Sequence, residues 1–483
     1  MKILHQIRFL PFYLFFIALL IGTCNYPFFW DTIQLASKHA HFFYDSGFHN
    51  IILPNEIDSG HIPTLGIYLA IIWKIAGKSL IISHLAMLPF VLAIVYQSIL
   101  LVSRVFDPEW HYYALVILLA DATLLAQCTL VSPDIILVCF FLMALNNLLF
   151  RKPFWYSVAL TGLMLASLRG MMCVAGFFIA DVIIYFAENK IFSALNKSKN
   201  VSREIVKIIR CYLPSVIIAL CFFIWHYYKT GWIGYHKTMP WYPLFENVNL
   251  KGAIFNIFIL GWRLIDFGRI FIWLTGAFCL WHYFKNHPPV PAFLKSFIII
   301  FICIFLSLSE AVILHKNLSG HRYLLPVYLL FAILVTFYLF EVIKSRFLKK
   351  AIFYLMLLGM LSGNFLVYPD QIAKGWDSTL AYLPYFPMRE KMMDYMGKEG
   401  IELSETGTLF PNTGPIEYID LSGKKKSFAE FDLKSNHYVF YSNVFNGFSE
   451  AELSELKMNW KPVKVYKFLM VKIILYAAPY YSR

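Results

Sequence analysis

Charged side chains are rare in this sequence, and three of them stand beside long apolar runs, where a membrane protein could use them for chemistry. Asp31 follows the apolar residues 9–30, Arg169 separates two apolar runs, and Arg322 begins a late one. Ionisable residues at membrane depth are costly and are usually functional. Arginines hold phosphate through paired hydrogen bonds, and a carboxylate can accept the proton of an attacking hydroxyl. We therefore predict that Arg169 and Arg322 hold a lipid-linked phosphate and that Asp31 is the general base.

The segment after Asp31 adds further candidates. We expect His61 and Asp58 at the same site, and we expect Lys74 and Lys78 to help to hold the phosphate. Asp58 and Asp45 are also alternative bases.

Each candidate has a plainer interpretation that stays open. Asp31 would then only cap a helix that begins at Thr32, where the helix dipole favours an acid. The two arginines would only extend to lipid headgroups, and the lysines would only be solvated. Asp134 is expected to be structural, because it begins an apolar run in which a helix N-terminus welcomes a carboxylate.

No cofactor is expected with certainty, and a divalent cation is kept as an alternative. Glu310 and His321 are candidate ligands for it, but no metal-ligand spacing supports them. Neither a phosphate-binding loop of nucleotide-dependent enzymes nor a dinucleotide-binding glycine motif occurs.

The composition indicates which solvent surrounds these residues. Hydrophobic residues make up 59% of the 483 residues and charged residues only 15%, whereas soluble domains are about one quarter charged. Lipid must therefore surround much of the chain. The eight cysteines lie in or beside the apolar runs, which is typical of small buried hydrophobic residues and not of a disulfide framework.

About 20 apolar residues are needed to cross a bilayer as a helix. By this measure the sequence predicts about eleven transmembrane helices, the first over residues 9–30. The other ten are predicted over residues 80–103, 111–130, 134–150, 154–168, 170–187, 211–228, 254–284 (one crossing with an extra helix), 296–314, 323–343 and 351–368.

The basic residues test the orientation of these spans. With the N-terminus inside, the short loops that fall on the inner side are the basic ones, which is the arrangement that orients membrane proteins. The net charge of +13 comes from residues 1–368, because residues 369–483 carry equal numbers of acidic and basic residues. We therefore expect no nucleic-acid partner, a cytoplasmic N-terminus and a C-terminal segment on the outer side.

Two parts of the chain are not predicted to span. The first outer loop, residues 31–79, holds two amphipathic stretches over residues 32–44 and 63–76, which are expected to be helices at the membrane interface. A spanning interpretation of residues 62–77 would invert every later loop. Residues 369–483 alternate helix and strand signals, including Ser449 followed by Glu452, which is typical of a helix start.

These features together define the expected fold class. The sequence predicts an all-α polytopic membrane bundle with interfacial helices, residues 1–368, followed by a small soluble α/β domain, residues 369–483. The basic loops favour the bacterial inner membrane, with the C-terminal domain in the periplasm. A eukaryotic secretory-pathway membrane is the alternative, since Asn317-Leu318-Ser319 forms a glycosylation acceptor.

Five short motifs now carry a resemblance. They stand in order along residues 1–368: Trp30-Asp31, Gly60-His61-Ile62-Pro63-Thr64-Leu65, Ser132-Pro133-Asp134, Leu165–Gly170 and Arg322–Pro326. In this pattern the chain resembles the C-type membrane glycosyltransferases, in the branch of protein O-mannosyltransferases and lipid A aminoarabinose transferases. It departs from them in having Thr32 where a second acid is usual and a single proline, Pro63, where two are usual.

The resemblance implies a glycosyltransferase that moves one sugar from a polyprenyl-phosphate carrier to a lipid, glycan or protein acceptor outside the cytoplasmic membrane, with inversion at the anomeric carbon. Two alternatives stay open. One is a polysaccharide ligase with a pyrophosphate-linked donor, and the other is a flippase or transporter of lipid-linked sugars.

Overall fold

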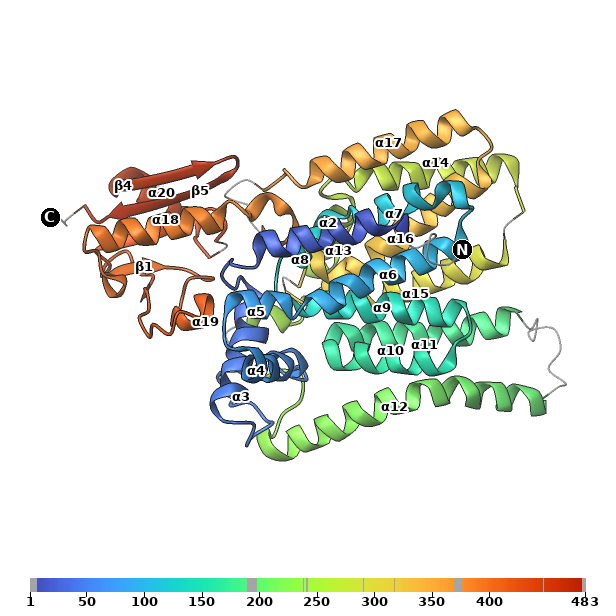
Figure 1. The fold of residues 1–483 in the computed structure, drawn as a ribbon, viewed down its shortest axis with the longest axis horizontal. Helices are drawn as coiled ribbons and strands as arrows, with labels where there is room; N and C mark the ends of the chain where they lie inside the picture. Colours follow the sequence, from blue (N-terminus) through green and yellow to red (C-terminus); the bar gives the residue numbers. More distant parts are fainter. Residues whose placement is uncertain are drawn as a thin grey trace.

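The chain is described here from a computed structural model. The structure describes residues 7–188, 198–237, 239, 242–289, 291–316, 318–368, 376–445 and 447–479. It is a helical bundle with a small sheet-containing domain at one end (Figure 1). The predicted fold class is therefore confirmed.

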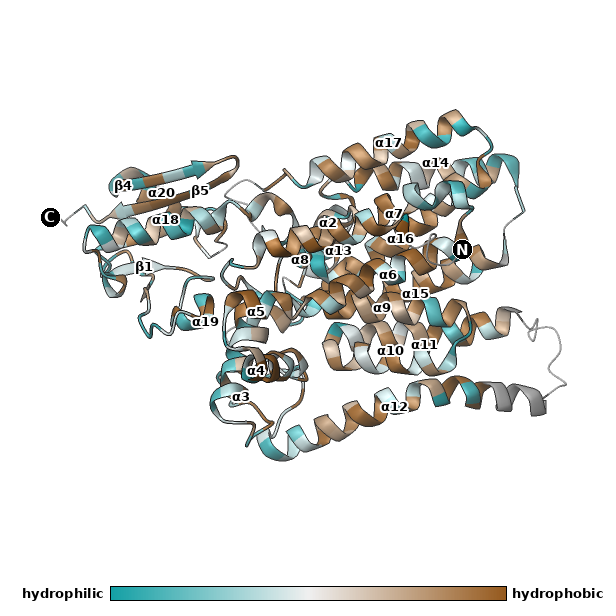
Figure 2. Cartoon of the chain, in the orientation of Figure 1, coloured by the Kyte–Doolittle hydropathy of each residue, from teal (hydrophilic) through white to brown (hydrophobic). Residues whose placement is uncertain are grey.

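The bundle is built from apolar helices that follow the predicted spans closely. Hydrophobic residues cover these helices, whereas the domain at the end of the bundle is more hydrophilic (Figure 2). The bundle helices are α2 (Leu10–Thr23), α5 (Leu80–Leu85), α6 (Leu88–Val105), α7 (His111–Leu119), α8 (Ala122–Cys128), α9 (Pro133–Leu149), α10 (Pro153–Ala166), α11 (Leu168–Glu188), α12 (Ser198–Thr230), α13 (Leu250–Ile265), α14 (Ile270–Asn286), α15 (Ala292–Leu314), α16 (Leu325–Phe337) and α17 (Arg346–Gly363).

Helix length and composition alone give fewer membrane crossings than the eleven that the sequence predicts. Among the described residues, five helices are long and apolar enough to cross a membrane, or six if α7 and α8, bent by 69°, are one broken span. Shorter apolar helices include α2, α9 and α10. A 14-residue helix such as α10 is only about 21 Å long, so the count of eleven stays a prediction.

The span expected over residues 254–284 is broken into α13 and α14 by a tight turn. Phe267 and Gly268 both have positive φ there, 52° and 82°. A side chain at Gly268 would collide with the backbone oxygen of Gly359 on α17, so only glycine fits this close approach. The turn places Asp266 and Arg269 against different neighbours.

Residues 31–79, which keep the name first outer loop after their predicted side, fold into short helices as expected. These are η1 (Thr32–Lys38, a π-helix), α3 (His39–Asp45) and α4 (Thr64–Ala76). Figure 1 shows α4 almost end-on, so it runs across the direction of the bundle helices, as an interfacial helix does. Its apolar side packs inward through Leu69 and Trp73, which are 0% and 1% exposed.

Residues 376–479 form the predicted α/β domain. Its helices are α18 (Tyr385–Lys398), α19 (Glu417–Asp420) and α20 (Glu450–Asn459), with short 3-10 turns η8 (Trp376–Ser378), η9 (Leu380–Tyr382) and η10 (Leu403–Glu405). The expected capping box of Ser449 and Glu452 is present at α20. Its strands are β1 (Thr406–Thr408), β2 (Ala429–Glu430), β3 (Tyr438–Ser442), β4 (Lys461–Phe468) and β5 (Val471–Ala477).

The five strands form one mixed sheet in the order β2-β1-β3-β5-β4. β1 is parallel to both β2 and β3, while β5 is antiparallel to β3 and β4. β3 is fully buried, and β4 is an exposed edge strand. The expected turn at Asn446-Gly447 falls partly outside the described residues, as does the glycosylation acceptor at Asn317.

The domain and the bundle share an apolar cluster that fixes one against the other. Phe29, just after α2, stacks on Tyr382 with ring centroids 5.0 Å apart, and Tyr26 stacks on Phe386 at 4.6 Å. The Thr129 hydroxyl and the Tyr382 hydroxyl also share a buried hydrogen bond of 2.7 Å. The first outer loop and the C-terminal domain consequently lie at the same end of the bundle (Figure 1).

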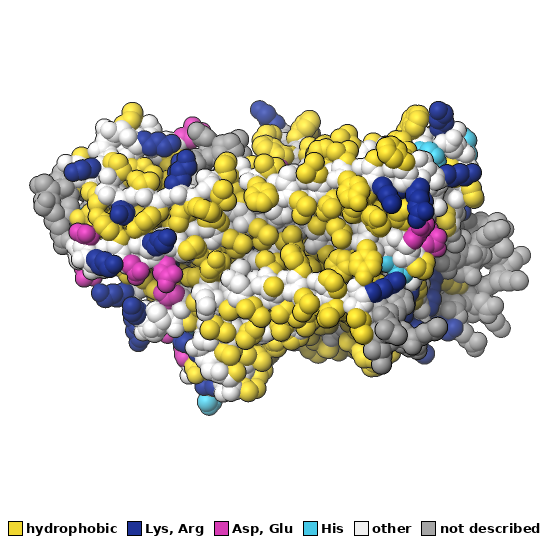
Figure 3. Space-filling model, turned by 45° about the horizontal axis from the view of Figure 1, so that its top comes forward, with side chains coloured by type: hydrophobic (Ala, Val, Ile, Leu, Met, Phe, Trp, Pro, Cys, Tyr) yellow, Lys and Arg dark blue, Asp and Glu magenta, His cyan; other side chains and the backbone are white. Residues whose placement is uncertain are grey.

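The surface shows the same division. On the face drawn in Figure 3, hydrophobic side chains cover the middle of the molecule, and Lys and Arg side chains gather towards its two ends. This is the pattern expected of a protein that crosses a bilayer along its long axis.

Candidate active site

Asp31 lies where the chain leaves α2 and turns into η1. The Thr32 hydroxyl donates to the Phe29 carbonyl and accepts from the Phe29 N–H, both at 2.7 Å, and this closes the turn. Trp30 takes a positive φ of 50°. π-helical turns such as η1 are rare and occur often at functional sites. The Asp31 side chain remains 36% exposed at this position.

Arg322 lies in the short η5 helix (His321–Leu324) that precedes α16. Its guanidinium donates to an Asp31 carboxylate oxygen at 2.6 Å and forms a close ion pair with Asp377 of η8. A third carboxylate, Asp134, lies 3.6 Å from its Nε. Arg322 is therefore the centre of three aspartates from distant parts of the sequence.

Arg169 joins the same group through Asp134. It lies at the start of α11, and its guanidinium forms a close ion pair with Asp134 at the start of α9. The Arg169 guanidinium also lies over the Tyr323 ring, 4.3 Å from the ring centroid. We call Asp31, Asp134, Arg169, Arg322 and Asp377 the acid–arginine cluster.

The exposure of the cluster is uneven. Asp134 and Asp377 are 3% and 8% exposed, and the two arginines are 15% and 11% exposed. Since Asp31 is 36% exposed, it is the carboxylate of the cluster that solvent or a substrate reaches most easily. The buried carboxylates Asp134 and Asp377 hold the two arginines in place.

His61 lies against this cluster but is neutral. Its Nδ1 accepts a hydrogen bond from the Leu168 N–H at 3.2 Å, in the turn that carries Arg169. Burial, together with a smaller contribution from the positive charge of Arg169, lowers the pKa of His61 to about 4. A neutral His61 with Nδ1 as acceptor has its proton on Nε2, so it can act as a donor at the site but not as a cation.

Asp58 lies in a separate buried pair. One oxygen accepts from the Gly60 N–H at 2.8 Å, and the other lies 2.9 Å from Nε2 of His226 on α12. Both side chains are 3% exposed. The pair ties the first outer loop to the end of α12, and this buried position makes Asp58 less accessible than Asp31 as a base.

Lys74 and Lys78 face the C-terminal domain and the aromatic residues of the loop. The Lys74 ammonium lies over the Tyr44 ring at 4.2 Å, and Lys78 donates to Glu417 of α19 at 3.1 Å. The contacts that the structure describes for the two lysines thus lead away from the acid–arginine cluster. Their role as phosphate ligands stays a prediction.

The Lys78–Glu417 contact gives a testable dependence on pH. The hydrogen bond from Lys78 lowers the pKa of Glu417 below its usual 4.5, with smaller contributions from the charges of Lys78, His41 and Lys425. Because the folded-state pKa is lowered, the stabilisation is complete above pH 4.5 and is lost as the pH falls below it. We expect Glu417→Gln to cost about 0.2–1 kcal/mol at pH 7 and progressively less as the pH falls below 4.5. Thermal unfolding of both proteins in detergent across this range measures the difference, and a difference that does not change with pH would contradict the assignment.

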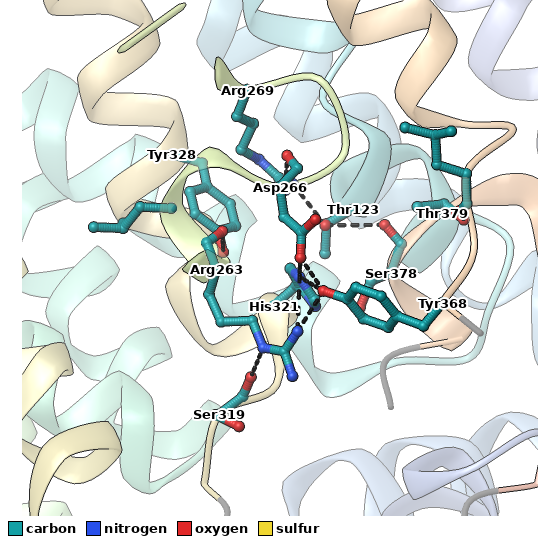
Figure 4. A network of polar contacts seen from close by, with 12 residues as sticks. Thr123, Arg263, Asp266, Arg269, Ser319, His321, Tyr328, Tyr368, Ser378 and Thr379 are labelled. Carbon is teal, nitrogen blue, oxygen red and sulfur yellow. Dashed lines mark hydrogen bonds and ion pairs between the residues drawn. The ribbon is translucent and has the colours of Figure 1, made fainter. Parts of the chain in front are cut away.

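Behind Arg322 a second polar network holds the η5 turn in place (Figure 4). His321 Nε2 lies 2.9 Å from Asp266, whose carboxylate also accepts a short hydrogen bond from the Tyr368 hydroxyl. The Arg263 guanidinium donates to the Ser319 carbonyl at 3.0 Å. The network therefore links the α13–α14 turn to the residue next to Arg322.

Arg269, on the other side of that turn, makes a buried pair with Asp121. Its Nε and one Nη donate to the two carboxylate oxygens at 2.8 and 2.9 Å. Thr123 accepts from the same Arg269 at 2.6 Å and donates to the Ser378 carbonyl at 3.0 Å. Through these contacts, Asp121 at the break between α7 and α8 is linked to Ser378, the residue after Asp377.

The sequence interpretation missed Asp377. Its signal is present in retrospect: Asp377 follows Trp376 just after the last apolar run, as Asp31 follows Trp30 after the first. For the alternative cation site, Glu310 is exposed on α15, whereas His321 is buried and bonded to Asp266. Within the described part of the chain, no group of three or more His, Cys, Asp or Glu side chains is arranged to hold a metal ion.

No protein-family model and no curated protein sequence matches the chain. Two solved structures match it along nearly their whole length. They are ArnT from Cupriavidus metallidurans bound to undecaprenyl phosphate (11% identity, 97% of this chain and 97% of that chain, TM-score 0.54) and the same protein in the apo state (11% identity, 96% and 97%, TM-score 0.52). The chain therefore has an ArnT-like fold, which confirms the fold that the resemblance implied.

Proposed function

We propose that this chain is a membrane glycosyltransferase that transfers one sugar from a polyprenyl-phosphate carrier to an acceptor on the outer side of the membrane. The observation that carries the proposal is the acid–arginine cluster, in which the accessible Asp31 lies 2.6 Å from Arg322. Its place beside the first outer loop, in a fold like that of a protein crystallised with undecaprenyl phosphate, supports the choice of carrier.

In the proposed mechanism, Arg322 and Arg169 hold the phosphodiester of the donor. The acceptor hydroxyl attacks the anomeric carbon while the bond from that carbon to the phosphate oxygen breaks. Asp31 takes the proton of the hydroxyl, and the carrier leaves as polyprenyl phosphate with one more negative charge. The arginines stabilise this developing charge, which is a large catalytic effect in a water-poor site. A single displacement implies inversion at the anomeric carbon.

The donor phosphate must share Arg322 with Asp31. One Nη of Arg322 is bound to Asp31 and the other to Asp377. A phosphate that takes over the first of these bonds frees an Asp31 oxygen for the acceptor. Binding of the donor would thereby prepare the base, while the buried Asp377 keeps Arg322 in place.

The Asp31 side of the cluster is proposed to face the periplasm of a bacterial cell, with the N-terminus in the cytoplasm. The C-terminal domain packs over the same end of the bundle as the first outer loop (Figure 1). The cluster includes its residue Asp377, so we propose that this domain completes the site. The acceptor would be a lipid, a glycan or a protein.

The proposal is tested with the purified chain in nanodiscs and two radiolabelled donors, polyprenyl phosphates that carry mannose or aminoarabinose. A membrane extract supplies acceptors. We expect one of the donors to release polyprenyl phosphate as its label moves to an acceptor. Consumption of a pyrophosphate-linked glycan would favour the ligase alternative, and movement of intact donor across a liposome bilayer would favour the flippase.

A further inference from the structure

The turn between β4 and β5 exposes three consecutive apolar side chains. Phe468, Leu469 and Met470 are 59%, 63% and 54% exposed. Lys467 and Lys472 stand opposite each other in the strand register just before and just after this turn. An apolar tip with lysines behind it resembles, in chemistry, the side chains that proteins place at a membrane surface. We call residues 468–470 the hairpin tip.

The backbone of the hairpin tip makes its apolar composition unexpected. Leu469 has a φ of 51°, in the left-handed region that Asn and Gly adopt readily and leucine does not. Tight hairpin turns with positive φ strongly prefer those residues. Folding alone would therefore favour a polar or glycine turn here, so the exposed leucine indicates a contact outside the domain.

The direction of the hairpin identifies that contact. In Figure 1 the two strands run along the length of the molecule, and the turn between them is the end that points towards the bundle. The start of β4 and the end of β5 lie at the far end. On the bundle side, Phe365 and Leu366 after α17 are also exposed, by 68% and 51%. The hairpin tip therefore points towards the end of the bundle at which these two apolar side chains are exposed.

We propose that the hairpin tip inserts its apolar side chains into the outer interface of the bilayer that holds the transmembrane helices. The lysines then lie at the level of the headgroups, where anionic lipids attract them. The insertion gives the C-terminal domain a second attachment besides its packing on α8 and residues 26–30. It would hold the domain at a fixed height above the acid–arginine cluster, to which the domain contributes Asp377.

The depth of the hairpin tip can be measured by spin labelling of the full-length protein. A label is placed at Leu469→Cys in a background with Cys221→Ser and Cys211→Ser, the two cysteines that are not buried. The control label is at Met458→Cys, which is 73% exposed and precedes β4 at the other end of the hairpin. The measured quantity is the ratio of collisions with oxygen to collisions with a water-soluble nickel chelate. In nanodiscs that contain phosphatidylglycerol, this ratio is expected to be several-fold higher at position 469 than at position 458.

Equal nickel accessibility at the two positions would overturn the proposal. Shielding of position 469 from both reagents would overturn it too, because that result indicates a protein partner or a second copy. A second variant separates insertion from local misfolding. Replacing the tip by Phe468→Ser, Leu469→Asn and Met470→Gly suits the turn better, and a label at Lys467→Cys should then become more accessible to the nickel chelate than it is beside the native tip.

Discussion

Replacing Asp31 with asparagine should lower the rate of sugar transfer by about 100- to 10,000-fold, the usual contribution of a positioned general base. Asparagine keeps the size of the side chain and an oxygen that can accept from Arg322, so the site should still assemble. The affinity for polyprenyl phosphate is not expected to fall, because the arginines proposed to hold it remain and the carboxylate that competes for Arg322 is neutralised. Single-turnover rates with a radiolabelled donor, together with carrier binding, measure the two effects separately.

The matched control is Glu56→Gln, which changes an exposed carboxylate in the same loop. Its transfer rate should stay within a factor of two or so of the native rate, as expected of a surface change. If Asp31 only positioned Arg322, its asparagine variant would bind the carrier less tightly and would keep the native pH dependence of turnover. Transfer at the native rate in Asp31→Asn would exclude Asp31 as the base.

The positions of the bundle helices were predictable because they depend on a one-dimensional pattern. Long apolar runs specify where such helices lie. The α/β domain was predictable for the same reason, since the Ser449 capping box and the alternation in β4 and β5 are local signals. The positions at which apolar runs break into two helices were not predictable in detail. The turn at Gly268 depends on the close approach of Gly359, 91 residues further along the chain, which no local pattern reveals.

The site was predictable in part. Asp31, Arg169 and Arg322 stood out because charge is expensive beside apolar runs, and the structure places them in one cluster. Lys74 and Lys78 stood out for the same reason, but a helix presents its residues to several neighbours. Only the packing of α4 against Tyr44 and α19 determines which neighbour each lysine contacts.

Asp377 was missed because only the tertiary fold brings it next to Arg322. It belongs to a domain that sequence reasoning treated as separate from the membrane bundle. The stacking of Phe29 on Tyr382 brings that domain onto the bundle. One carboxylate of this domain therefore lies against Arg322.

Replacing Arg322 with methionine should destabilise the protein by about 3–5 kcal/mol, because it leaves buried carboxylates without their cation. Asp377 loses the ion pair that the structure describes for it, and Asp134 keeps only Arg169. The affinity for polyprenyl phosphate should also fall by about 30-fold or more, as expected when one partner of a buried charge pair is removed. Thermal unfolding and carrier binding of the variant in nanodiscs measure both losses.

A second substitution separates these two losses. Adding Asp377→Asn to the Arg322 variant removes one unpaired buried charge, so part of the stability should return while the carrier affinity stays low. The control is Arg346→Met, which breaks an ion pair whose arginine is 71% exposed and should cost at most about 1 kcal/mol. Equal stability of the Arg322 and Arg346 variants would mean that the cluster is not electrostatically coupled. Recovery of carrier affinity along with stability would mean that Arg322 organises the site without itself binding phosphate, and Arg169 would then be the arginine that holds the donor.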